Sequence, residues 1–201
     1  MNIKNTANLL LNFAIKRLAE IFGIIILLFG ASLLLALITY SPNDPNFIFP
    51  DNTKIENLMG FKGSFISDLL FQSAGLVAYL IPFTLIITGI NILRSKDFFL
   101  FIENIFFTIL YLIFGSLFFS HYYFDTYALF INGNGGFVGQ YLNDTFLKSL
   151  ILINKNVSFY IIILLIFISF LLSINFNLRN FIISIKKILN LFSKKDNKNY
   201  T

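Results

Sequence analysis

The side chains that could perform catalysis or bind a metal are few and widely spaced in this chain. It contains one histidine, His121, and no cysteine. Since a zinc site needs three or four ligands, His121 alone predicts no metal centre, and we interpret it as part of an aromatic belt at a membrane surface. The sequence motifs of zinc proteases and serine hydrolases are also absent. We therefore expect no catalytic residue, no metal and no cofactor.

Residues 132–139 are rich in glycine, and backbone amides of such a segment can hold a phosphate group. The segment lacks the Gly-Lys-Ser/Thr ending of a phosphate-binding loop and follows no predicted strand. We interpret it as a flexible loop.

Glu103 is the ionisable residue that lies inside a long apolar segment. Such a residue is by default a hypothesis for a proton or ion relay. However, Glu103 lies six residues after Asp97, or about 9 Å along a helix, so it can reach the lipid headgroups or pair with Arg94 or Lys96. We favour this structural placement and keep ion coupling as the alternative.

A nine-residue phrase, Gly-Phe-x-Gly-x-[Phe/Tyr]-[Ile/Leu]-x-Asp, occurs twice, 76 residues apart. The repeated positions are Gly60, Gly63 and Asp68 in the first copy and Gly136, Gly139 and Asp144 in the second. The repeat has two interpretations, which stay open: backbone geometry with a capping or lateral hydrogen bond, or a surface that binds a partner.

The elements that must position these residues are membrane-spanning helices. The chain is 57% hydrophobic and 12% charged, which excludes an ordinary soluble domain. A helix needs roughly 20 apolar residues to cross the hydrocarbon core. Four segments meet this requirement, at about 21–39, 76–93, 98–120 and 158–174.

The basic residues predict which side of the membrane each segment faces. Eleven of the 15 lysines and arginines lie in the two termini and in the short link between the second and third spans. The positive-inside rule therefore places both termini and the link in the cytoplasm and the two long loops outside.

We divide the chain into a cytoplasmic amphipathic N-terminal segment (1–19), a four-span membrane domain (20–177) and a cytoplasmic basic amphipathic tail (178–201). In the membrane domain, the order span, loop, surface helix, span occurs twice. Each surface helix is expected to follow a copy of the phrase, with Ser64 capping the first helix and Gly75 hinging it into the second span. The predicted fold is an all-α membrane protein built from two parallel repeats.

Several phrases together resemble the N-terminal membrane region of the bacterial FtsK/SpoIIIE DNA translocases. The first span ends in Tyr-Ser-Pro-x-Asp-Pro at 40–45, and Asn-x-x-Gly-x-x-Gly follows at 57–63. Asp-Leu-Leu at 68–70, Gly-Leu-Val-Ala-Tyr at 75–79 and a second glycine phrase at 135–139 complete the pattern. The resemblance covers about residues 17–175.

The resemblance implies a four-span domain in the bacterial inner membrane that is anchored at the division site, oligomerises and contacts other cell-division membrane proteins. Full members of the family continue into an ATP-driven motor and a DNA-reading domain. This chain has no phosphate-binding loop, so we expect neither translocase activity nor direct nucleic-acid binding from it. The motor would be a separate chain, or the gene is truncated.

We therefore expect a non-enzymatic membrane scaffold that supports cell division and chromosome segregation, with lipid, other division proteins and copies of itself as partners. The alternative is a small polytopic transporter or channel subunit. It would need a polar path through the spans, for which the sequence offers Glu103, Asn91 and scattered hydroxyl side chains. A membrane enzyme is disfavoured by the missing catalytic constellation.

Overall fold

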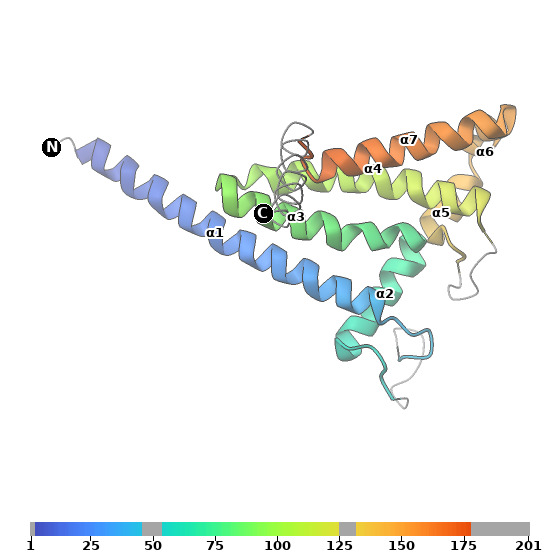
Figure 1. Ribbon diagram of the computed structural model, residues 1–201, viewed down its shortest axis with the longest axis horizontal. Helices are drawn as coiled ribbons and strands as arrows, with labels where there is room; N and C mark the ends of the chain where they lie inside the picture. Colours follow the sequence, from blue (N-terminus) through green and yellow to red (C-terminus); the bar gives the residue numbers. More distant parts are fainter. Residues whose placement is uncertain (1–2, 46–53, 125–131, 178–201) are drawn as a thin grey trace, which may run out of the picture.

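The computed structural model describes residues 3–45, 54–124 and 132–177 (Figure 1). Over these residues the elements are α1 (Ile3–Ile38), α2 (Gly60–Ala74), the 3₁₀ helix η1 (Gly75–Tyr79), α3 (Leu80–Ser95), α4 (Phe99–Tyr122), α5 (Gly136–Asn143), α6 (Phe146–Ile153) and α7 (Lys155–Ser173). Four helical segments are long and apolar enough to cross a membrane, namely Asn8–Ile38, Gly60–Ser95, Phe99–Tyr122 and Lys155–Ser173. The part of the chain that the structure describes contains no strand, so the predicted all-α fold with four spans is confirmed.

The predicted N-terminal segment and the first span form one helix. α1 runs without a break from Ile3 to Ile38, across the boundary expected at residues 19 and 20. The predicted basic tail, 178–201, lies outside the described residues. The assignment of the two ends of the bundle to the inside and outside of the membrane stays a prediction.

The spans lie roughly side by side, with α1 packed on α3, α3 on α4, and α4 on α7 (Figure 1). The helices α2, α5 and α6 gather at one end of this bundle, which we call the repeat end. The short α3–α4 link lies at the opposite end, which we call the link end. Both copies of the repeated phrase are therefore on the same side, as expected for parallel repeats.

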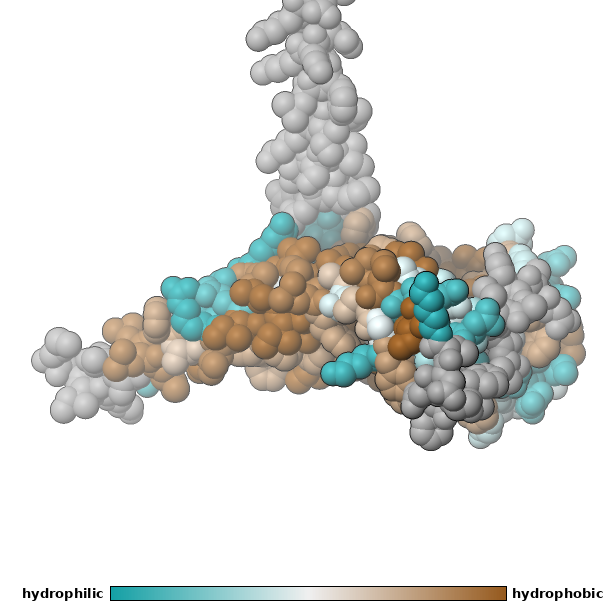
Figure 2. Space-filling view, turned by 90° about the horizontal axis from the view of Figure 1, so that it is seen from below, coloured by the Kyte–Doolittle hydropathy of each residue, from teal (hydrophilic) through white to brown (hydrophobic). Residues whose placement is uncertain are grey.

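The lateral faces of the bundle are strongly apolar. Figure 2 shows a broad hydrophobic surface in the middle of one face, with hydrophilic residues to either side. Large apolar side chains such as Leu28, Phe106 and Ile161 are exposed on three of the spans. This exposure is expected where the surrounding solvent is lipid, because hydrocarbon does not penalise apolar surface.

α1 and α3 pack closely through small residues. Buried positions recur every three or four residues along α1, at Ala19, Gly23, Ile26, Gly30, Leu33 and Leu37. A Cβ atom added at Gly89 of α3 would lie 2.8 Å from the carbonyl oxygen of Gly23. Small residues at such crossings let two backbones approach and increase van der Waals contact, which drives helix association in lipid.

Candidate functional site at the repeat end

The repeated phrase builds the same turn twice. Gly60 and Gly136 have φ angles of +66° and +63°, and each is the first residue of its helix. Each also donates its backbone N–H to the carbonyl oxygen three residues earlier, over 2.9 Å to Asn57 and 3.1 Å to Gly133. The repeat in sequence is therefore a repeat in backbone geometry, and glycine is favoured at the first position because φ is positive.

The second glycine of each copy faces a crowded neighbour. A Cβ atom at Gly63 would lie 2.4 Å from Oδ1 of Asn57, and one at Gly139 would lie 2.3 Å from the carbonyl oxygen of Ser116 on α4. Both glycines are buried. They are required because a neighbouring group approaches the backbone where a side chain would otherwise stand.

The predicted start of the first surface helix is wrong, whereas the predicted hinge is confirmed. α2 begins at Gly60, so Ser64 lies inside the helix and does not cap it; its hydroxyl donates to the carbonyl oxygen of Pro45 at 3.0 Å. α2 ends at Ala74, where Gly75 with a φ of +70° turns the chain into η1 and α3. Figure 1 shows the change of direction between α2 and α3.

A buried carboxylate fastens the first loop to the end of α1. Asp44 is 1% exposed and accepts hydrogen bonds from the backbone N–H groups of Glu56 at 2.7 Å and Asn57 at 2.9 Å. The amide of Asn57 in turn donates to the carbonyl oxygen of Ala36 at 2.8 Å. These contacts fix the chain just before α2 and satisfy a carbonyl in the last turn of α1.

The two repeated aspartates lie in different surroundings. Asp68 is 6% exposed, and its Oδ1 accepts a hydrogen bond from the Tyr40 hydroxyl at 2.9 Å, across from α2 to the end of α1. This is the lateral hydrogen bond that the repeat suggested. Asp144 is exposed and ends α5, where its backbone N–H donates to the carbonyl of Gln140 at 3.1 Å. A partner-binding role stays a prediction for both residues.

We expect Tyr40→Phe to lower the free energy of unfolding by about 2 kcal/mol, because it removes a hydrogen bond to a buried carboxylate. The loss of stability caused by Tyr40→Phe should be smaller when Asp68 is already replaced by alanine. A double-mutant cycle of unfolding in detergent micelles would measure this coupling. Tyr141→Phe is the matched control, since this exposed tyrosine should change stability by less than about 0.5 kcal/mol. Additive effects of the Tyr40 and Asp68 changes would contradict the described contact.

The same hydrogen bond makes a pH dependence predictable. Burial, and then the nearby Asp68 carboxylate, raise the pKa of the Tyr40 hydroxyl above its usual value of 10.0. Because the folded state has the higher pKa, the stabilisation is fully present below about pH 10 and is lost as the pH rises further. The difference in free energy of unfolding between the wild type and Tyr40→Phe should therefore stay constant through neutral pH. It should become smaller only under alkaline conditions.

The glycine-rich stretch is a packed junction between the two halves, which corrects its interpretation as a flexible loop. Asn134 is fully buried, and its carbonyl oxygen accepts the backbone N–H of Leu76 at 2.9 Å. A Cβ atom at Gly75 would lie 1.9 Å from that oxygen. Nearby, the Ser116 hydroxyl donates to the carbonyl of Ala74 at 2.9 Å. The second copy of the phrase is thus seated on the hinge that follows the first.

The outward sides of α2 and α5 carry equivalent aromatic residues. Phe61 is 44% exposed and Phe137 is 61% exposed, at matching positions of the two copies. Four residues later stand Phe65 and Tyr141, with ring centroids 6.4 Å and 6.5 Å from those of their partners. We call these residues the aromatic pairs. The glycines of the phrase therefore pack inward, while Phe61, Phe137 and Tyr141 are exposed.

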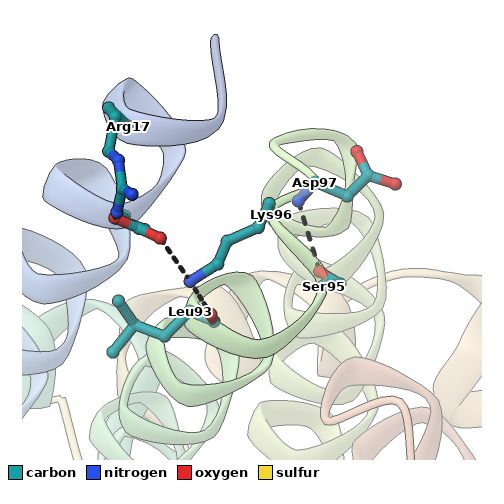
Figure 3. Close-up of polar contacts among 6 residues, drawn as sticks. Arg17, Leu93, Ser95, Lys96 and Asp97 are labelled. Atoms are coloured by element: carbon teal, nitrogen blue, oxygen red, sulfur yellow. Dashed lines mark hydrogen bonds and ion pairs between the residues drawn. The ribbon is translucent and has the colours of Figure 1, made fainter. Parts of the chain in front are cut away.

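At the link end, the ion pairs differ from those considered for Glu103. Lys96 pairs with Glu20 of α1 at 2.9 Å, and Arg17 pairs with the same carboxylate at 2.6 Å (Figure 3). Glu103 is exposed and has no ion pair among the described residues. Glu20 thus ties α1 to the α3–α4 link, a contact for which the sequence offered no signal because the partners are 76 residues apart.

A buried polar cluster inside the bundle was also missed by the sequence analysis. Asn104, next to Glu103, donates its amide to the Thr88 hydroxyl at 2.7 Å. The Thr84 hydroxyl lies 3.2 Å from that of Tyr111 and 3.1 Å from that of Ser173. These bonds join α3, α4 and α7, and such contacts hold membrane helices together. The sequence signal for this cluster was Asn104, an uncharged polar residue within a long apolar run.

The described residues contain no group of three or more His, Asp or Glu side chains that could hold a metal ion. The repeat end is built from hydrogen bonds, close glycine contacts and exposed aromatic rings.

Comparison with known proteins places these features in a family. A family model described as the 4TM region of DNA translocase FtsK/SpoIIIE matches residues 15–186. DNA translocase FtsK of Rickettsia prowazekii is 27% identical over 170 residues, which is 85% of this chain and 22% of that protein. DNA translocase FtsK of Caulobacter vibrioides is 37% identical over 79 residues, which is 39% of this chain and 10% of that protein. The chain thus spans less than a quarter of the length of these relatives, and no solved structure matches it.

Proposed function

Because this chain belongs to the family of the 4TM region of DNA translocase FtsK/SpoIIIE, we propose that it is a non-enzymatic membrane scaffold at the bacterial division site. It lies in the inner membrane with both termini in the cytoplasm, and the repeat end faces outward. There it contacts other division proteins, and so supports cell division and chromosome segregation.

The aromatic pairs are the observation that carries this proposal. The hydrogen bonds of Asp44, Asn57 and Asp68 hold α2, and the glycine junction holds α5, so both helices are fixed platforms. On these platforms Phe137 and Tyr141 stay exposed. Aromatic side chains on a rigid support are favoured at the centres of protein interfaces, because they bury a large area and lose little conformational entropy.

The proposal includes further partners that match a scaffold. Membrane lipid surrounds the spans, copies of the chain associate with one another, and DNA translocation is performed by an ATP-driven motor. A transporter or channel subunit is the weaker alternative. The buried hydroxyl groups of Thr84, Tyr111 and Ser173 bond to one another, which fits helix packing better than a path for ions.

A fluorescent fusion of the full chain tests the proposal in a growing bacterium. We expect the wild type to gather at midcell and the double change Phe137→Ala and Tyr141→Ala to weaken this enrichment several-fold. The control is Tyr160→Ala, since Tyr160 is an exposed aromatic residue on α7, away from the repeated phrase. Even distribution of the wild type around the envelope would overturn the proposal, and equal effects of both variants would remove the aromatic pairs from it.

A further inference from the structure

A groove runs between α1 and the first turns of α2, at the repeat end. Its volume is about 220 Å³, and its walls are almost entirely apolar. The space exists because small residues line both helices where they diverge. The walls include Phe29, Ser32 and Ala36 of α1 and Lys62, Gly63 and Ile66 of α2.

The groove lies at the same depth in the membrane as the headgroup and the adjoining acyl chain of a lipid molecule. α1 is a membrane-spanning helix that ends at Ile38, and Ala36 lies two residues before this end. From there to Phe29 the groove follows α1 over seven residues, about 10 Å towards the middle of the membrane. Its Phe29 end therefore lies among acyl chains, and its Ala36 end lies at headgroup level.

Lys62 supplies a positive charge in the wall of the groove. The residue is exposed and forms no ion pair within the described residues, and the walls of the groove contain no acidic side chain. An ammonium group beside an apolar slot complements a phosphate group that is attached to an acyl chain. A transmembrane helix of another protein would fill the slot but would leave this charge without a partner.

Comparison of the two copies of the phrase shows that its turn can form without a lysine at this position. Val138 occupies the position in the second copy that Lys62 occupies in the first. Both copies form the same turn with glycine at positive φ, so the turn does not depend on the lysine. Lys62 can therefore be neutralised without disturbing α2.

We propose that this groove binds one anionic phospholipid from the membrane leaflet at the repeat end. The phosphate lies beside Lys62, and an acyl chain follows α1 from Ala36 towards Phe29. This site is independent of the scaffold role, because it needs no division protein.

Native mass spectrometry of the full chain in detergent tests the headgroup part of the site. We expect the wild type to retain phosphatidylglycerol more strongly than diacylglycerol with the same acyl chains. Lys62→Gln should lower the retention of phosphatidylglycerol about fivefold, the effect of one lysine near an anionic surface. Lys54→Gln is the matched control, because Lys54 is exposed before the same helix but does not line the groove. Equal effects of the two changes would overturn the proposal.

Ser32→Leu tests the acyl-chain part, since the larger side chain fills the groove and keeps α1 apolar. We expect it to reduce retention of both lipids, whereas Ser32→Ala should leave retention unchanged. Helix content by circular dichroism should be the same for all variants. If Ser32→Leu weakens an oligomer and leaves lipid retention unchanged, the groove is a contact between copies of the chain and the proposal is wrong.

Discussion

Gly136→Ala is expected to destabilise the protein by at least about 3 kcal/mol, whereas Gly60→Ala at the equivalent position should cost only about 1 kcal/mol. Both glycines have nearly the same φ, so an added side chain meets the same backbone strain in each copy. The surroundings differ. A Cβ atom at Gly60 would have no atom within 4 Å, whereas one at Gly136 would lie 2.6 Å from the backbone nitrogen of Gly75. Backbone atoms of a packed junction cannot move aside without separating the two halves.

The pair of variants can be compared by reversible unfolding in mixed detergent micelles, followed by circular dichroism. Because each change is glycine to alanine at a positive φ, the difference between them isolates the steric contact. Equal losses of stability would mean that the second phrase is not seated on the Gly75 hinge. A clearly larger loss of stability for Gly136→Ala would confirm that the two repeated turns, although alike in geometry, differ in what they support.

Gly89→Leu should have an effect of similar size on the first half of the bundle. A Cβ atom at Gly89 would lie 2.8 Å from the carbonyl oxygen of Gly23 and 2.8 Å from the backbone nitrogen of Leu27, so a larger side chain must push α1 away from α3. We expect a loss of more than about 3 kcal/mol, beyond the usual range for single substitutions. Gly89→Ala should still destabilise, although alanine favours a helix by about 1 kcal/mol over glycine.

Thermal unfolding of the Gly89 variants would measure this series. Phe83→Leu on the same helix is the control, because Phe83 is exposed and should tolerate the change. The steric argument requires the order wild type, Gly89→Ala, Gly89→Leu in decreasing stability. If Gly89→Leu is no less stable than Phe83→Leu, then α1 and α3 do not meet at this glycine.

The features that the sequence predicted well depend on local properties. A long apolar run defines a span by its length alone, so all four spans were predicted. The third and fourth agree to within a few residues, whereas the first two helical segments begin 13 and 16 residues earlier than expected. The repeat and the Gly75 hinge were also predicted, because a glycine at a fixed offset signals an unusual backbone angle. The family resemblance rested on the same landmarks and is confirmed by the match over residues 15–186.

The features that were missed depend on distant contacts. Ser64 has the chemistry of a helix cap, but its hydroxyl bonds to Pro45, and no local rule could choose between these roles. Asn134 lies in a stretch whose composition suggests flexibility, yet the other half of the chain buries it. The second surface helix is divided into α5 and α6, with Thr145 accepting a hydrogen bond from the backbone N–H of Leu147 at 3.3 Å. In that case a capping signal was present and overlooked.

The hydrogen bond from Leu76 to Asn134 has a consequence for the order of biosynthesis. The two residues are about 60 positions apart, so at 5–20 residues per second Asn134 is made roughly 3 to 12 seconds after Leu76. During that interval the backbone amide of Leu76, in η1, lacks the acceptor that it has in the finished protein. α1 and α3 can pair as a hairpin while the ribosome is still translating. The final geometry of their connection, however, is expected only after the third span has entered the bilayer and Asn134 lies beside Leu76.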